Sequence, residues 1–156
     1  MDAFQIKIIT RATAKKQQGI MKSYVEGIQT CFNMTLDRAI ETTDLTDDIF
    51  GTSRIFALVT GRSNVAASCI LAINKKYNTC EIRQVCIQEQ HRGKGLCKTL
   101  LKLALDYLKD IGIYQAQIYC MEKYLPAFKC YSKLFPDHHA VLGKKIKYHA
   151  FVKFLI

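Results

Sequence analysis

A strand, a turn with two glycines and a helix follow one another in the middle of this chain and constrain its fold more than any other segment. The residue pattern predicts a strand over Cys80–Gln88 and, from apolar residues at helical spacing, a helix over Leu96–Ile111. Gly93 and Gly95 lie between them, where glycine lets the backbone turn tightly and lets a ligand approach it closely. The free N–H groups at the start of the helix point into this turn, so the sequence predicts an anion-binding site there.

Two familiar phosphate-binding patterns do not fit this turn. A dinucleotide-binding pattern requires a third glycine where Lys98 stands, and a P-loop requires glycines where Arg92 and Cys97 stand. The net charge of +10 still favours an anion: residues 1–50 carry six basic and seven acidic side chains, and the remainder carries seventeen and six. Nucleic acid is the competing ligand, but no helix-turn-helix, zinc finger or RNA-binding aromatic motif supports it, so we expect no nucleic-acid partner.

Length, hydrophobicity and cysteine content limit the class of protein. The 156 residues, 49% of them hydrophobic, predict a single domain over residues 1–156. The chain has no apolar run as long as a membrane span and no signal peptide at its start, so we expect an intracellular, cytoplasmic protein without a membrane partner. The seven cysteines include no Cys-x-x-Cys pair, and we interpret them as small buried side chains in a reducing compartment, with no metal site.

Three segments resemble one enzyme family in their order and spacing. Gln90, Gly93 and Gly95 match the pattern Q-x-x-G-x-G. The segments on either side are Glu81-Ile82-x-x-Val85-x-Ile87 and Ala127-x-x-Cys130-Tyr131-x-Lys133-Leu134. Together they resemble the GNAT superfamily of acetyl-CoA-dependent N-acetyltransferases, over the region from Ile55 to Phe135. Tyr124 and Phe135-Pro136 depart from the family's pattern, which has Asn and Gly-Phe at these positions.

The resemblance implies an α/β (α+β) structure, the GNAT fold, with a central mixed, mostly antiparallel sheet and about four helices in the order β-α-α-β-β-β-α-β-α-β-β. The residue pattern agrees with this order. It predicts strands over 3–10, 55–59, 65–73, 80–88, 114–121, 139–142 and 146–156, and helices over 15–32, from Thr35, over 96–111 and over 126–134. The strands at 80–88 and 114–121 should be parallel, because a helix connects them.

The resemblance also implies a binding site for acetyl-CoA, without a metal. Backbone N–H groups of the turn would hold the pyrophosphate, from Gln90, His91, Arg92, Gly93, Lys94, Gly95 and Leu96. The side chains of Arg92 and Lys94 would either add charge at the phosphates or project into solvent. The backbone of Val85, Cys86 and Ile87 would pair with the pantetheine arm as an added strand. An N–H of Val85 or Ile87 would polarise the thioester carbonyl.

Two residues are candidates for proton transfer. Tyr131 matches the family's tyrosine that protonates the CoA thiolate, although spacing alone would favour a core or interface tyrosine on an amphipathic helix. Glu81 matches a glutamate that some members use as a base, and it is predicted to share a strand face with Arg83, Val85 and Ile87; half of a structural ion pair is the equal alternative. Glu122 is a weaker candidate for the base. The three histidines near the acceptor side of this fold, His138, His139 and His149, are interpreted as solvated side chains.

The sequence therefore predicts an N-acetyltransferase in which a primary amine attacks acetyl-CoA directly in a ternary complex. The acceptor stays open between an amino sugar phosphate such as glucosamine 6-phosphate, another small amine, and a protein lysine or N-terminus. The acidic segment Thr42–Asp48 is interpreted as a solvated loop, with a cationic acceptor as the alternative. A non-catalytic, CoA-binding regulatory module of the same fold is the alternative function. A homodimer, in which the alternating last strand would pair across the dimer, stays open.

Overall fold

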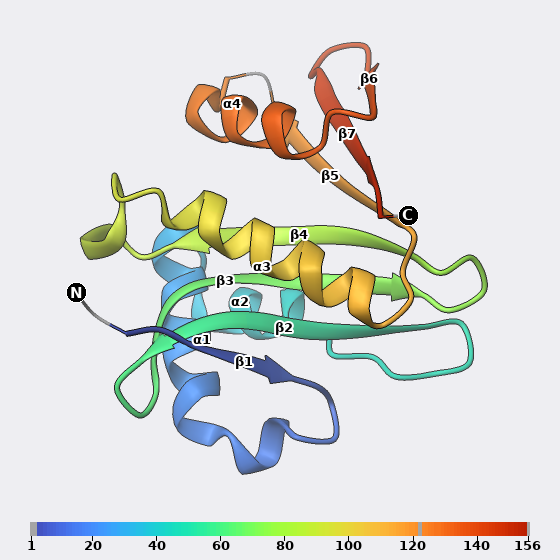
Figure 1. Ribbon diagram of the computed structural model, residues 1–156. Coiled ribbons are helices and arrows are strands. Elements are labelled where there is room, and N and C mark those ends of the chain that lie inside the picture. Colours follow the sequence, from blue (N-terminus) through green and yellow to red (C-terminus); the bar gives the residue numbers. More distant parts are fainter. Residues whose placement is uncertain (1–2, 122, 156) are drawn as a thin grey trace.

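A single seven-stranded sheet, in the order β1-β2-β3-β4-β5-β7-β6, forms the centre of this computed structural model, which describes residues 3–121 and 123–155 (Figure 1). Its strands are β1 Gln5–Ile9, β2 Gly51–Thr60, β3 Asn64–Asn74, β4 Thr79–Ile87, β5 Gln115–Met121, β6 His138–Leu142 and β7 Tyr148–Phe154. The helices are α1 Gln18–Phe32, α2 Leu36–Thr42, α3 Leu96–Asp110 and α4 Leu125–Leu134, with short 3-10 turns η1 Ala14–Lys16 and η2 Glu89–His91. The predicted fold class and order of elements are confirmed.

Strand pairing is antiparallel throughout the sheet except between β4 and β5. These two strands are joined through α3 and are parallel, as predicted, but they pair only over Thr79–Ile82 and Gln115–Ile118. Beyond Ile118, β5 diverges from β4 (Figure 1). Along its other edge, β5 pairs with β7 over its whole length. The last five residues of β4 therefore have a strand neighbour, β3, on one edge only.

Helices cover both faces of the sheet, because each helix has one apolar stripe to bury. On one face, α3 places its leucines against β2–β5, and Tyr131, Phe135 and Phe151 join the same core. On the other face, α1 and α2 bury Ile20, Tyr24, Ile28 and Ala39 against β2–β4. Figure 1 shows α3 and α1 on opposite sides of the central strands.

Several predicted helix boundaries are confirmed by their local chemistry. Asn33 ends α1 in the left-handed conformation, with φ of 51°. The side chain of Thr35 caps α2 by accepting a hydrogen bond from the N–H of Arg38 at 3.2 Å. Gly112 follows α3 with φ of +89°, and Pro126 lies in the first turn of α4.

A bulge in β4 corrects the predicted arrangement of the side chains around Glu81. Gln84 has φ of 49°, and the register with β3 shifts between Ser68 and Ile70. The extra residue reverses the alternation. Val85 and Ile87 consequently pack on the α3 side, whereas Cys86 packs on the α1 side. The prediction that Glu81 shares a face with Val85 and Ile87 is therefore wrong.

The first and last strands also differ from their predicted patterns. In β1 the buried residue is Ile9, whereas Phe4 and Ile6 are exposed. In β7, His149 is buried rather than solvated as predicted, because Phe128 of α4 and His139 of β6 pack against its ring. The strand pairs with β5 on one edge and β6 on the other, so both of its edges are paired within the chain.

No helix in the described part of the chain is long and apolar enough to cross a membrane.

Candidate active site

The turn between β4 and α3 has the backbone geometry that its two glycines predict. Gly93 and Gly95 have φ of +75° and +74°, a region that side-chain-bearing residues adopt at a cost. A Cβ added at either glycine would meet no described atom within 4 Å. Both glycines are exposed, so the outer side of the turn is open to a ligand.

The N–H groups of this turn fall into two sets. Those of His91 and Arg92 donate to the carbonyls of Gln88 and Glu89, at 2.9 and 3.2 Å, within the 3-10 turn η2. The six N–H groups from residue 93 to residue 98 form no hydrogen bond with any other described residue. Of the amides predicted to hold a pyrophosphate, those of His91 and Arg92 therefore already donate to backbone carbonyls. The amides of residues 93–98 have no such partner and are available to bind an anion.

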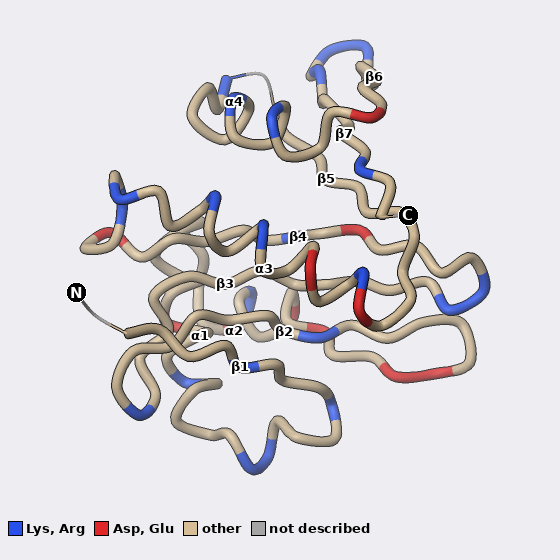
Figure 2. The backbone as a smooth tube through the Cα atoms, viewed as in Figure 1, with Lys and Arg blue, Asp and Glu red and all other residues tan. Residues whose placement is uncertain are grey.

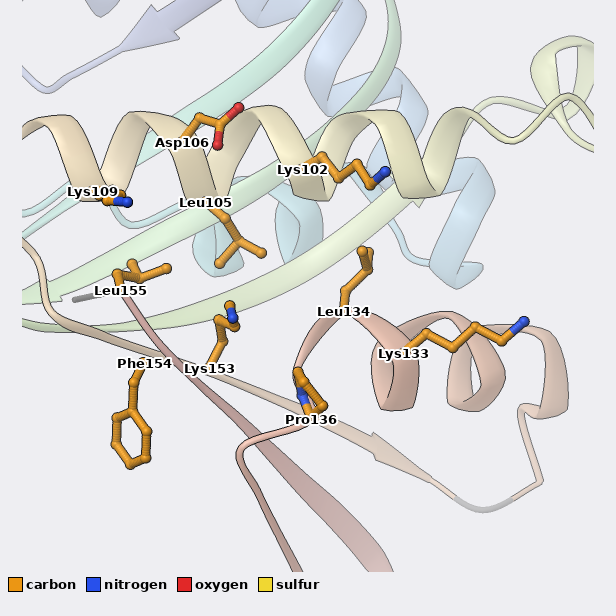
Figure 3. Close-up of a pocket in the computed structure, with 10 residues that line it drawn as sticks. All are labelled: Lys102, Leu105, Asp106, Lys109, Lys133, Leu134, Pro136, Lys153, Phe154 and Leu155. Atoms are coloured by element: carbon orange, nitrogen blue, oxygen red, sulfur yellow. The ribbon is translucent and has the colours of Figure 1, made fainter.

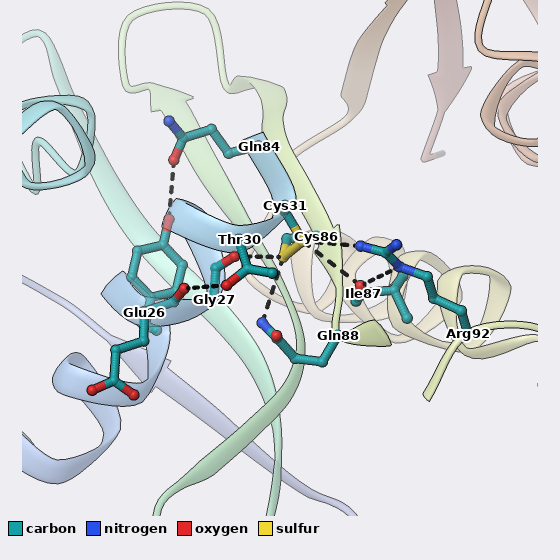
Figure 4. The surroundings of a disulfide bond; sticks show 10 residues. Glu26, Gly27, Thr30, Cys31, Gln84, Cys86, Ile87, Gln88 and Arg92 are labelled. Carbon is teal, nitrogen blue, oxygen red and sulfur yellow. Dashed lines mark hydrogen bonds between the residues drawn. A yellow bond between two sulfur atoms is a disulfide. The ribbon is translucent and has the colours of Figure 1, made fainter. Parts of the chain in front are cut away.

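The charged side chains of the turn do not all point toward it. Arg92 folds back onto the end of β4, where its Nε donates to the carbonyl of Ile87 at 2.9 Å (Figure 4). The ring of His91 packs edge-on against Phe4, with ring centroids 6.0 Å apart. Lys94 and Lys98 are exposed beside the turn. Arg92 is itself exposed, and its hydrogen bond holds it at the end of β4. Whether it adds charge at the phosphates or projects into solvent stays a prediction.

The unpaired edge of β4 leads directly into the glycine turn. Gln88 N–H donates to the carbonyl of Ala66 in β3 at 2.9 Å. Successive amides of a strand point to opposite edges, so the amides of Val85 and Ile87 point to the open edge and that of Cys86 points to β3. The pairing of this edge with a pantetheine arm, predicted for Val85, Cys86 and Ile87, stays a prediction.

Cys86 has a different role from the predicted packing of a free thiol. Its sulfur forms a disulfide with Cys31, which ties α1 to β4 (Figure 4). On the same face, the hydroxyl of Tyr24 donates to Oε1 of Gln84 at 3.1 Å, at the bulge. The reading of the cysteines as reduced is therefore wrong for this pair. Sequence spacing gave no signal for it, because 55 residues separate the two cysteines.

A cavity of about 570 Å³ opens where β4 and β5 diverge. Aromatic and apolar side chains form most of its walls, and its lining residues include Phe32, Glu81, Arg83, Val85, Tyr119, Met121, Tyr124, Tyr131 and Tyr148. It brings together the two predicted catalytic residues, Tyr131 and Glu81, with the open edge of β4. We call it the β4–β5 cleft. The aromatic residues Tyr119, Tyr124 and Tyr148 were not predicted to be site residues, because they come from three elements, β5, the start of α4 and β7, that meet only in the folded chain.

Tyr131 presents a protonated phenol to the cleft. It is 7% exposed, and burial raises its pKa above the ordinary value of 10, so the phenol stays protonated at neutral pH. Its hydroxyl forms no hydrogen bond with any other described residue, although a buried tyrosine in a core usually has such a partner. A protonated hydroxyl at the wall of the cleft is available to a ligand.

Glu81 forms an ion pair with Arg83, with Oε2 and Nη2 2.9 Å apart. The hydrogen bond with Glu81 raises the pKa of Arg83. The carboxylate that a base would need is engaged in the resting structure, and it would have to leave Arg83 or act through a water molecule. Glu122 lies outside the described residues.

His139 of β6 and His149 of β7 form a cluster of their own, whereas His138 is exposed, as predicted. Nε2 of His139 lies 2.7 Å from Nδ1 of His149, and the rings stack with centroids 4.9 Å apart. Phe128 and Phe151 surround them. None of these residues lines the β4–β5 cleft. Among the described residues, no group of three or more His, Cys, Asp or Glu side chains is placed to hold a metal ion.

A second cavity, of about 420 Å³, lies between α3, the end of α4 and the end of β7 (Figure 3). Its floor is apolar, and its charged lining residues are Lys102, Asp106, Lys109, Lys133 and Lys153. It shares no residue with the β4–β5 cleft or with the glycine turn. We therefore assign neither the cofactor nor the acceptor to it.

Comparison with known proteins agrees with this geometry. The sequence model of the acetyltransferase (GNAT) family matches residues 21–135. The chain therefore belongs to this family of acetyl-CoA-dependent N-acetyltransferases. No curated protein is significantly similar to the chain in sequence.

Solved structures with the same fold include N-acetyltransferases with different acceptors. A mutant spermidine N-acetyltransferase from Vibrio cholerae has a TM-score of 0.69 at 18% identity, covering 97% of this chain and 94% of its own. The Vibrio cholerae enzyme in complex with CoA and spermine has a TM-score of 0.65 at 17% identity, covering 97% and 95%. A ribosomal-protein-alanine N-acetyltransferase from Escherichia coli has a TM-score of 0.68 at 11% identity, covering 97% and 94%. At such identities the similarity shows the fold alone.

Proposed function

We propose that this protein transfers the acetyl group of acetyl-CoA to a small primary amine by direct attack in a ternary complex. One observation carries the proposal: the open edge of β4 runs from a cleft that contains Tyr131 to a turn with six free amides. This arrangement supplies a site for the pantetheine arm beside a site for the pyrophosphate. The cavities of about 420, 360, 440 and 510 Å³ elsewhere at the described residues do not combine these features.

Each step of the reaction has a candidate group in this arrangement. The free amides of residues 93–98 would bind the pyrophosphate, together with the exposed charges of Lys94 and Lys98. The outward amides of Val85 and Ile87 would pair with the pantetheine arm, and one of them would stabilise the oxyanion of the tetrahedral intermediate. Tyr131 would donate its proton to the departing CoA thiolate. A non-catalytic CoA-binding module would not require a buried tyrosine hydroxyl with no hydrogen-bond partner among the described residues.

The candidate for the general base is Glu81. Glu81 lies in the cleft, but its ion pair with Arg83 makes a structural role the simpler reading of the described contacts. We retain Glu81 as the proposed base acting through water, since no other carboxylate of the described residues lines the cleft. The acceptor amine must be deprotonated before it attacks, because an ammonium group has no free electron pair.

The charges near the cleft favour an acceptor that carries an anionic group. A cavity of about 510 Å³ adjoins the β4–β5 cleft and shares Met121 and Tyr148 with it. Its charged lining residues are Lys123, Lys145 and Lys147, and none of them pairs with a described carboxylate. The blue β6–β7 loop in Figure 2 carries two of these lysines. An amine with a phosphate would be attracted here, whereas a polycationic amine would be repelled.

The acidic segment Thr42–Asp48 does not offset these lysines. Asp47 pairs with Lys75 at 2.8 Å, and Oδ1 of Asp48 accepts hydrogen bonds from the amides of Phe50 and Gly51. Hydrogen bonding to Lys75 lowers the pKa of Asp47, and hydrogen bonding to the two amides lowers that of Asp48. Two of the segment's three carboxylates, those of Asp47 and Asp48, are thus used locally, which supports the interpretation of this segment as a loop rather than a subsite for a cationic acceptor.

Acceptor preference is tested by measuring thiol release from acetyl-CoA with three amines: glucosamine 6-phosphate, glucosamine and spermidine. We expect the phosphorylated amine to have the highest kcat/KM. Replacing Lys145 or Lys147 by Gln should raise the KM for the phosphorylated amine about fivefold, through the loss of about 1 kcal/mol of attraction, and leave glucosamine unaffected. Lys16→Gln is the matched control, because Lys16 is exposed, lines neither cavity and pairs with no described carboxylate.

Two outcomes would contradict different parts of this proposal. A preference for spermidine that the lysine substitutions strengthen would reject the anionic acceptor and keep the transferase. Tight binding of acetyl-CoA without thiol release, with these and with lysine peptides, would favour the non-catalytic module. The single-domain organisation, the cytoplasmic location and a homodimer stay predictions from the sequence.

A further inference from the structure

Two free cysteines meet between the helix that begins at the glycine turn and the helix that carries Tyr131. Cys97 is the second residue of α3, and Cys130 precedes Tyr131 in α4. Their sulfur atoms lie 3.7 Å apart, and both side chains are partly exposed. The other free cysteines, Cys69, Cys80 and Cys120, are buried.

We propose that Cys97 and Cys130 form a thiol–disulfide exchange site, which a low-molecular-weight disulfide oxidises to an intramolecular disulfide. The distance is the main support. A disulfide requires the sulfurs to lie about 2.05 Å apart, so an approach of about 1.7 Å would close the bond. Rotation of the two side chains, neither of which is fully packed, can supply much of this approach. The inference does not depend on the proposed acetyl transfer.

The surroundings favour Cys130 as the attacking sulfur. The hydrogen bond with Cys97 and the nearby charges of Lys98 and Lys133 lower the pKa of Cys130 to about 7, whereas the same pairing raises the pKa of Cys97. A thiol with a pKa near neutrality is the most effective nucleophile in exchange at neutral pH. Burial raises the pKa of Cys69 and raises that of Cys80 to about 12, so these thiols are poor competitors.

The reaction balances in two exchange steps. The Cys130 thiolate attacks one sulfur of the small disulfide, forms a mixed disulfide and releases one small thiolate. The Cys97 thiol then loses its proton and attacks the Cys130 sulfur, which releases the second small thiol. In total, two protein thiols are oxidised to one disulfide and one small disulfide is reduced to two thiols. The new bond would tie the first turn of α3 to α4.

Tryptic mapping of the full chain tests this site. The protein is incubated with oxidised glutathione at neutral pH, unfolded, alkylated, digested with trypsin without reduction, and examined by mass spectrometry. Cleavage after lysine and arginine places Cys97 in the peptide 95–98 and Cys130 in the peptide 130–133. We expect a linked pair of these peptides, with Cys69, Cys80 and Cys120 recovered as alkylated thiols. The Cys31–Cys86 bond joins a different pair, 23–38 and 84–92, and so cannot be confused with it.

Two variants separate the two steps. Cys97→Ser lacks the second thiol, so glutathione should accumulate as a mixed disulfide on Cys130. Cys130→Ser lacks the first nucleophile, and modification of Cys97 should be at least about tenfold slower than modification of Cys130 in the other variant. The proposal would be overturned if Cys97 and Cys130 of the unsubstituted chain were both recovered alkylated, or if glutathione labelled the buried cysteines as rapidly. Whether Cys97 and Cys130 become linked is decided by the unsubstituted chain alone, even if a variant fails to fold.

Discussion

Gly93→Glu is expected to weaken acetyl-CoA binding by about a hundredfold or more while the protein stays folded. The glutamate side chain would project into the open space of the turn, because no described atom lies within 4 Å of the added Cβ. Its carboxylate would then lie close to a bound pyrophosphate, and like charges about 4 Å apart near a protein surface repel by about 4 kcal/mol. Isothermal calorimetry with acetyl-CoA measures the loss of affinity.

Gly112→Glu is a matched control for this substitution. Gly112 also has a positive φ, +89°, and open space around its Cβ position, but it lies at the opposite end of α3. Both substitutions should cost about 1 kcal/mol of stability through backbone strain, and only Gly93→Glu should abolish binding. Equal binding by the two variants would show that the turn does not hold the cofactor.

Tyr131→Phe should reduce kcat by about a hundredfold and leave the affinity for acetyl-CoA nearly unchanged. A general acid contributes to the step in which the thiolate leaves and little to the bound ground state. Burial raises the pKa of Tyr131 above 10, so the acid remains protonated over the neutral and mildly alkaline range. The remaining activity should therefore show the same dependence on pH below 10 as that of the unsubstituted enzyme.

Tyr119→Phe provides the comparison for Tyr131→Phe. Tyr119 lines the same cleft. Removing its hydroxyl therefore shows how much kcat changes when any tyrosine hydroxyl is lost from the wall of the cleft. Single-turnover rates and acetyl-CoA affinities should be measured for both variants. If Tyr131→Phe lowers only the midpoint of thermal unfolding and keeps the full kcat, Tyr131 is a core residue and not the acid.

The parts of the fold that local chemistry determines could be predicted from the sequence. Helix α3 was predicted from its periodic leucines, and its end from Gly112. The glycine turn was predicted because Gly93 and Gly95 stand between a strand and a helix. Thr35 and Pro126 likewise indicated helix starts without knowledge of the rest of the chain. In each case the residue determines the conformation of its immediate neighbours.

The features that were missed depend on contacts between distant segments. The bulge at Gln84 has no glycine to indicate it, and it reverses the faces of Val85 and Ile87. His149 is buried only because α4 and β6 fold over β7. The Cys31–Cys86 bond and the Cys97–Cys130 contact join elements far apart in the sequence. Alternation along one strand cannot reveal which of its faces another element will cover.

The claim that the amides following β4 bind the pyrophosphate is tested most directly by a ¹H–¹⁵N NMR titration of the labelled protein with CoA. We expect the amide signals of Gly93 and Gly95, and those of Val85 and Ile87 on the open edge, to shift with saturation at one CoA per chain. The signals of Gly112 and Gly143 should stay in place. Binding of CoA that shifts other amides and leaves Gly93 and Gly95 unmoved would contradict this account of the site.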